Sequence, residues 1–106
     1  MGAYLDSPIK EKNPENGVNE HCAWGACSMQ GWRCGMEDAH IAREIALPAT
    51  KSKGMLFGVF DGHGGKEVAY FSECNFQQVL EALPSFKKGD YKEALREAFH
   101  KTDNMV

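Results

Sequence analysis

The sequence predicts an α+β fold in which strands lie between residues 22 and 60 and helices follow them. Residues alternate with a period of two in the stretches 22–30 and 39–47, and from Val68 onward apolar residues recur every three to four residues. The chain has 106 residues, of which 42% are hydrophobic and 25% are charged. This is enough for one modest core, so we expect one domain or part of one.

Residues 1–20 are expected to form an extended N-terminal arm. They contain Pro8 and Pro14 together with several asparagines, and they show little apolar periodicity. Strands are predicted at residues 22–30, 39–47 and 55–60, where small and large or polar and apolar residues alternate. The third of these is apolar on both faces, which predicts a central strand. The polar turn at residues 48–54 joins the last two strands as an antiparallel hairpin.

Two helices are predicted after the strands. The first begins at the Gly64-Gly65 turn and ends before Pro84. The second begins after Asp90, which forms a capping pair with Glu93, and its pattern is still running at Val106. We therefore expect residues 21–106 to be part of a domain that is truncated at its C-terminal end.

Charge and composition exclude several classes of function. The net charge of −3 gives no basic surface for nucleic acid or for an anionic membrane. The longest apolar stretch is too short to cross a bilayer, and no signal sequence is recognisable, so a cytoplasmic location is expected. The cysteines lack Cys-x-x-Cys spacing, and we expect free thiols rather than zinc ligands or disulfides at Cys22, Cys27, Cys34 and Cys74.

Gly2 becomes an acceptor for myristoylation once Met1 is removed. The usual hydroxyl residue at position 6 is replaced by Asp6, so a plain initiator sequence and a lipidation signal both stay open. A single myristoyl chain would give only reversible membrane contact.

Two charged clusters follow strand ends. Arg33 is followed by the adjacent carboxylates Glu37 and Asp38, and Asp61 is followed by Gly62 and His63. The predicted hairpin returns the chain to the edge where the first cluster lies, so three carboxylates and one arginine are expected to converge. Because such carboxylates repel one another, hard divalent ions such as Mg2+ or Mn2+ are expected between them.

The same side chains favour phosphoryl chemistry. A centrally placed aspartate can bridge two ions, and two ions can activate a water and stabilise both oxygens of a phosphoryl displacement. Arg33 suits a bidentate grip on phosphate, and His63 suits protonation of a leaving alcohol. Taken singly, each residue also has a bland interpretation as a solvated turn, a surface charge or a strand end.

The motifs resemble those of the metal-dependent serine/threonine protein phosphatases of type 2C, also called the PPM family. Residues 33–38 are similar to the family's Arg-x-x-Met-Glu-Asp motif, and residues 59–65 are similar to its Asp-Gly-His-Gly/Ala-Gly motif. Residues 1–6 and 28–33 also resemble the eukaryotic cytosolic branch. The resemblance implies a pair of packed antiparallel β-sheets flanked by helices, with residues 21–106 as the N-terminal portion of the catalytic domain.

The resemblance also implies roles for individual residues. Asp61 would bridge two Mn2+ or Mg2+ ions, and Gly62 would offer its backbone carbonyl to one of them. Glu37 would bind metal directly or through water, and Asp38 would support that shell. The remaining roles are phosphate binding by Arg33, general acid catalysis by His63 and myristoylation of Gly2. Phosphoprotein substrates are implied, with partial membrane association or a nuclear location as alternatives to the cytoplasm.

Two other functions stay open. The family's catalytic domain is longer than this chain, and its later metal-binding aspartates are absent here. The chain could therefore be a binding or regulatory module, or one that needs a missing C-terminal part. A simple phosphate or nucleotide site at the Gly-rich turn is the other alternative, although no Gly-x-Gly-x-x-Gly or Gly-Lys-Ser/Thr sequence is present.

Overall fold

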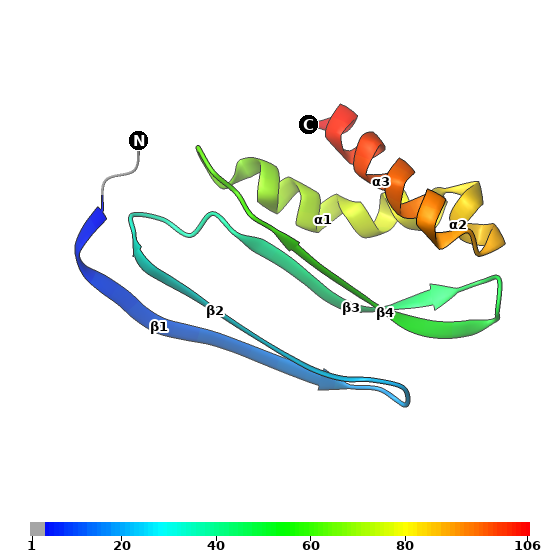
Figure 1. Ribbon diagram of the computed structural model, residues 1–106, viewed down its shortest axis with the longest axis horizontal. Helices are drawn as coiled ribbons and strands as arrows, with labels where there is room; N and C mark the ends of the chain where they lie inside the picture. The colour runs from blue at the N-terminus through cyan, green and yellow to red at the C-terminus, as the bar shows by residue number, and fades with distance from the viewer. Residues whose placement is uncertain (1–3) are drawn as a thin grey trace. The chain divides into compact units, whose positions relative to one another are not determined.

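The computed structural model describes residues 4–106, which fall into two compact units that divide between Met36 and Glu37. The first unit contains β1 (Tyr4–Val18) and β2 (Ala23–Arg33). The second contains β3 (Ala39–Leu47), β4 (Ser52–Phe60), α1 (Glu67–Ala82), α2 (Pro84–Lys88) and α3 (Tyr91–Met105). Both sheets are antiparallel, so the predicted α+β class is confirmed (Figure 1).

The first unit is a long antiparallel hairpin. Val18 lies opposite Ala23 at the turn, and the pairing extends to Tyr4 opposite Arg33 through two register shifts. The interpretation of residues 1–20 as an extended arm foresaw the extended backbone of residues 4–18 but not its pairing with β2. The reason is that β1 is rich in polar residues and lacks the apolar alternation that normally marks a strand.

The hairpin formed by β3 and β4 confirms the predicted strand pair. Its register runs from Ala39 opposite Phe60 to Leu47 opposite Ser52. The expectation that β4 is central is wrong for the described residues, in which β4 pairs with β3 alone. Its outward side chains are accordingly exposed, with Phe57 at 50% and Val59 at 77%.

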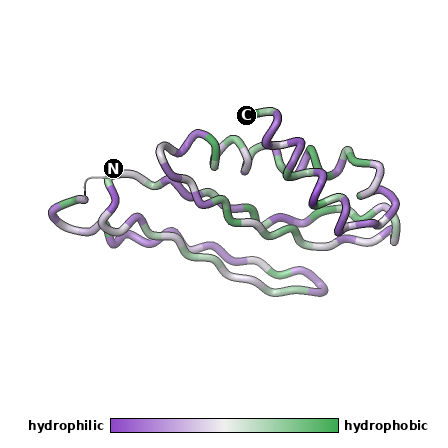
Figure 2. Tube along the Cα trace, turned by 45° about the horizontal axis from the view of Figure 1, so that its top comes forward, coloured by the Kyte–Doolittle hydropathy of each residue, from purple (hydrophilic) through white to green (hydrophobic). Residues whose placement is uncertain are grey.

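Three helices lie on one side of the β3–β4 hairpin (Figure 1 and Figure 2). Helix α1 begins later than predicted, because Gly64 and Gly65 have positive φ angles that a right-handed helix cannot contain. Helix α2 was not predicted, since a single turn is too short to show a period. The predicted cap of α3 is confirmed: the Glu93 backbone N–H donates a hydrogen bond to Asp90 Oδ1 at 3.4 Å.

The core of the second unit lies between this hairpin and the helices. It joins the inner face of β3 to residues from all three helices, and Leu83 is only 2% exposed. Two alanines of α3 are completely buried, which allows α3 to pack closely against its neighbours. The buried cluster comprises Ile41, Ile45, Phe76, Leu80, Leu83, Phe86, Ala94 and Ala98.

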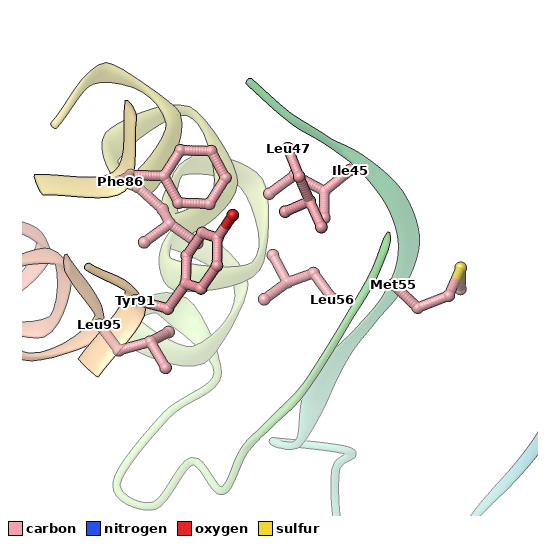
Figure 3. Close-up of a pocket in the computed structure, with 8 residues that line it drawn as sticks. Ile45, Leu47, Met55, Leu56, Phe86, Tyr91 and Leu95 are labelled. Atoms are coloured by element: carbon pink, nitrogen blue, oxygen red, sulfur yellow. The ribbon is translucent and has the colours of Figure 1, made fainter. Parts of the chain in front are cut away.

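An apolar pocket of about 160 Å³ lies beside this core (Figure 3). Tyr91 lines it, with its ring packed edge-on against Phe86 at a centroid distance of 5.6 Å. The Tyr91 hydroxyl points toward the aliphatic side chains of β3, where it is buried without a hydrogen-bond partner among the described residues. A polar group in this position costs stability.

Among the described residues, none of the four cysteines forms a disulfide; Cys22 is half-buried and the others are exposed. Within residues 4–106, none of the helices has the length and hydropathy needed to cross a bilayer.

Candidate active site

The strand register brings one carboxylate of each sequence motif, Asp38 and Asp61, to the same end of the β3–β4 hairpin. Ala39, the first residue of β3, lies opposite Phe60, the last residue of β4. Asp38, just before β3, and Asp61, just after β4, therefore lie at the same end of the sheet. The Phe60 ring packs against Phe76 of α1 at a centroid distance of 5.9 Å, which holds the strand end that leads into Asp61. The predicted meeting of Asp38 and Asp61 at one edge of the sheet is therefore confirmed.

Glu37 is held directly by the turn that follows β4. Its half-buried side chain accepts a hydrogen bond at Oε1 from the backbone N–H of Gly65, with a nitrogen to oxygen distance of 3.0 Å. The two residues are 28 positions apart. This contact therefore ties the motif after β2 to the motif after β4 by a specific polar interaction.

Glycine is required at the point where the two motifs approach most closely. A methyl group at Gly62 would overlap the backbone carbonyl oxygen of Glu37 and would lie 3.2 Å from the Cβ of Ala69 in α1. Farther along the turn, Gly64 has φ 71° and Gly65 has φ 129°. These angles fold the chain back from the strand into α1, and the second lies outside the left-handed region that other residues tolerate.

A pocket of about 460 Å³ opens at this turn. Asp61 and His63 contribute exposed side chains to it, while Val59 and Val68 contribute exposed apolar surface. On its helical wall Ser72 is buried and donates its hydroxyl to the Val68 carbonyl oxygen at 2.8 Å, so this hydroxyl is used within α1. The full lining is Val59, Phe60, Asp61, Gly62, His63, Gly65, Val68, Ala69 and Ser72.

The expected convergence of three carboxylates is not seen. Residues 4–106 contain no group of three or more His, Cys, Asp or Glu side chains placed to hold a metal ion. The contact that forms instead is between the Glu37 carboxylate and a backbone N–H. The oxygen donors near the turn still suit Mg2+ or Mn2+ in kind, because Mg2+ typically takes one or two protein carboxylates and keeps several waters.

The geometry of the second unit does not test two of the predicted residues. Arg33 is the last residue of β2 and belongs to the first unit, with an exposed side chain. Its role in binding phosphate stays a prediction. Gly2 lies outside the described residues, and its lipidation stays a prediction as well.

Sequence reasoning missed the contribution of Gly65 and of the α1 residues that line the pocket. Consecutive glycines after a strand signalled a turn, but nothing in the sequence identified the Glu37 carboxylate as the acceptor of the Gly65 N–H. Val68 and Ser72 are spaced four residues apart on α1, a spacing that reads equally well as ordinary core packing.

Comparison with known proteins identifies the family. The family model described as Protein phosphatase 2C matches residues 22–106. Over its whole length the chain is 44% identical to protein phosphatase 2C homolog 3 of Schizosaccharomyces pombe, of which it covers 26%, and 44% identical to probable protein phosphatase 2C 21 of Arabidopsis thaliana, of which it covers 29%. It is also 45% identical to probable protein phosphatase 2C 4 of Paramecium tetraurelia, again over its whole length, and covers 34% of that protein. The chain thus spans about a quarter to a third of the length of these relatives. It belongs to the protein phosphatase 2C family.

Proposed function

We propose that the protein takes part in the metal-dependent hydrolysis of phosphoserine and phosphothreonine in phosphoproteins. The observation that carries the proposal is the strand register, in which Ala39 lies opposite Phe60, so that Asp38 and Asp61 lie at one end of the sheet. Membership of the protein phosphatase 2C family, argued above from its model and relatives, supports the same reaction.

Each polar residue then has a role that suits its chemistry. Asp61, Glu37 and the Gly62 carbonyl would hold two Mn2+ or Mg2+ ions, with Asp38 supporting them. When bound, these ions supply a nucleophilic water at neutral pH and neutralise charge on the phosphate. The Arg33 guanidinium binds the phosphate oxygens as a bidentate donor.

Proton transfer to the leaving group falls to His63. Its exposed imidazole lines the pocket two residues after Asp61, where a phosphorylated side chain can reach it. As a general acid, His63 donates a proton to the serine or threonine oxygen as the bond from that oxygen to phosphorus breaks. The alcohol then leaves as a neutral molecule.

The test is hydrolysis of a phosphothreonine peptide with and without Mn2+. We expect metal-dependent turnover that Asp61→Asn abolishes. Asp90→Asn is the matched control, because asparagine caps α3 as well as aspartate does and lies in no proposed site. Turnover that is independent of Mn2+, or that survives Asp61→Asn, would contradict the proposal.

A second candidate is a module that acts only with a further part of the catalytic domain. Exposed apolar side chains on β4 and α3, including Val59, Leu95 and Phe99, favour it because they suit burial against another surface. The test mixes the chain with the portion of the Schizosaccharomyces pombe relative that follows the matched region. Mn2+-dependent turnover by the mixture but by neither part alone would establish this candidate, and turnover by the chain alone would exclude it.

We also propose that Gly2 is myristoylated, which would give a cytoplasmic protein reversible contact with membranes. Mass spectrometry of the protein from eukaryotic cells tests this: Gly2→Ala should remove the added acyl mass, and an unmodified wild-type N-terminus would contradict it.

A further inference from the structure

We propose that Gly65 is a positioning residue for the metal site: its backbone N–H fixes the Glu37 carboxylate so that Glu37 meets a divalent cation in one orientation. The inference rests on the proposed function, since it assumes that Glu37 serves a metal ion. Gly65 is the last residue of the second motif, but the role proposed here belongs to its main-chain N–H and does not follow from the motif or from side-chain chemistry.

The geometry that carries the inference consists of two contacts between the same segments. The Gly65 N–H donates to Glu37 Oε1 at 3.0 Å, and the Gly62 backbone lies against the Glu37 carbonyl. One contact therefore fixes the Glu37 main chain and the other fixes its side-chain carboxylate. A long, flexible side chain that is held at its backbone and at its carboxylate loses less conformational freedom when a cation binds. Hydrogen bonds to carboxylates are also among the stronger ones in proteins.

The backbone angle explains why this position needs glycine. At φ 129° Gly65 lies in a region that side-chain-bearing residues avoid, and a methyl group there would also meet the Glu67 carboxylate. That carboxylate is the end of a flexible side chain and can move. The main effect of Gly65→Ala is therefore on the backbone, whose rotation redirects the N–H away from Glu37.

The neighbouring glycine offers a matched control. Gly64 has φ 71°, where alanine is strained but by less than at φ 129°, and a methyl group there would meet nothing within 4 Å. Gly64→Ala thus changes the same turn by the same atoms while leaving the donor to Glu37 in place.

The first measurement is Mn2+ affinity by titration calorimetry of wild type, Gly64→Ala and Gly65→Ala, after circular dichroism has shown that each is folded. Loss of a group that orients a metal ligand typically weakens affinity about 10- to 100-fold. We expect a loss of this size for Gly65→Ala and a much smaller change for Gly64→Ala. Equal affinities for the two variants would overturn the inference.

The second measurement follows the Gly65 amide proton by NMR and does not depend on the folding of Gly65→Ala. Glu37→Gln keeps an oxygen acceptor, so the amide should stay protected from solvent exchange. Glu37→Leu removes the acceptor, and exchange should become at least about tenfold faster. Identical exchange in Glu37→Leu and wild type would overturn the inference.

The two measurements separate this inference from the proposed function. If wild type and Gly65→Ala bind Mn2+ with equal affinity, Gly65 has no positioning role and the proposed phosphatase function is unaffected. A wild-type protein that binds no Mn2+ would contradict the proposed function and the positioning role together, whatever the Gly65 amide reports.

Discussion

At the scale of single residues, Gly62 determines how closely the two motifs can approach. A methyl group there would overlap the Glu37 carbonyl oxygen and crowd Ala69. Because both neighbours belong to backbone or to a buried helix face, the contact cannot be relieved by rotating a side chain. We expect Gly62→Ala to lower the free energy of unfolding by about 1–3 kcal/mol, as overpacking does elsewhere. Urea denaturation followed by circular dichroism measures it.

The control for this change is Gly35→Ala. A methyl group at Gly35 meets nothing within 4 Å, and the residue is exposed. Its free energy of unfolding should stay within about 0.5 kcal/mol of the wild-type value. If Gly62→Ala were equally neutral, the close approach of the two motifs would not limit what residue 62 can be.

The Tyr91 hydroxyl gives a residue-scale prediction of the opposite sign. It is buried without a partner among the described residues, in surroundings of aliphatic and aromatic side chains. Tyr91→Phe removes the unpaired group and keeps the ring contact with Phe86, so we expect stability to rise by about 1 kcal/mol. Thermal denaturation checks this, with the exposed Tyr4→Phe as the control. A destabilised Tyr91→Phe would mean that the hydroxyl does have a partner.

Sequence reasoning selected the candidate site residues from chemistry that is local to each motif. Glu37, Asp38 and Asp61 were chosen as adjacent or strand-end carboxylates, and the structure brings their segments to one edge. The hydrogen bond between Gly65 and Glu37 could not be predicted, because it depends on a φ angle and on a partner 28 residues away. The metal and substrate roles of these residues stay predictions.

At the scale of secondary-structure elements, the first turn of α3 combines a cap with an ion pair. Arg96 donates to the Glu93 carboxylate through both Nε, at 3.0 Å, and Nη2. This hydrogen bonding lowers the pKa of Glu93 below its ordinary value of 4.5; desolvation opposes the shift, and the charge of Arg96 adds to it. Because the pKa of Glu93 is lower in the folded state, its ionised carboxylate stabilises the fold at pH values above the ordinary pKa. This stabilisation is lost as the pH falls through the folded-state pKa.

Arg96→Gln tests this pairing. We expect the pKa of Glu93 to rise toward its ordinary value, because the charged donor is gone. Carboxyl chemical shifts recorded by NMR during an acid titration measure it. Arg43→Gln is the control, since Arg43 pairs with Glu73 of α1 instead. An unchanged Glu93 titration in Arg96→Gln would show that the pair does not persist in solution, as is common for exposed ion pairs.

The sequence predicted those elements that bury one face, because burial of one face gives apolar residues a regular spacing along the chain. Ile41 and Ile45 alternate along β3 and face the core, and Phe76 and Leu80 are four residues apart on α1. The pairing of β1 was not predicted because its polar side chains show no such pattern. Its pairing with β2 is made by main-chain groups, which every residue type provides. Helix α2 escaped because five residues are shorter than two helical turns, even with Pro84 at its start.

At the scale of the whole molecule, burial is distributed unevenly between the two units. All fully buried residues of residues 4–106 lie in the second unit, and none of the described residues of the first is buried. A two-stranded hairpin without a buried face is marginally stable in water. The second unit, in contrast, has a contiguous core that holds the strand ends carrying Glu37 and Asp61 in place.

This distribution predicts how the chain responds to loss of core volume. Leu83 joins α1 to α2 and is almost completely buried, so Leu83→Ala should cost about 2–5 kcal/mol through lost transfer energy and the cavity it leaves. Amide hydrogen exchange should then become faster throughout α1, α3 and β3, whose protection depends on this core. In the wild type, the β1–β2 amides should already exchange faster than those of the core helices. If the β1–β2 amides proved as protected as those of α1, their stability would have to come from something other than burial within their own unit.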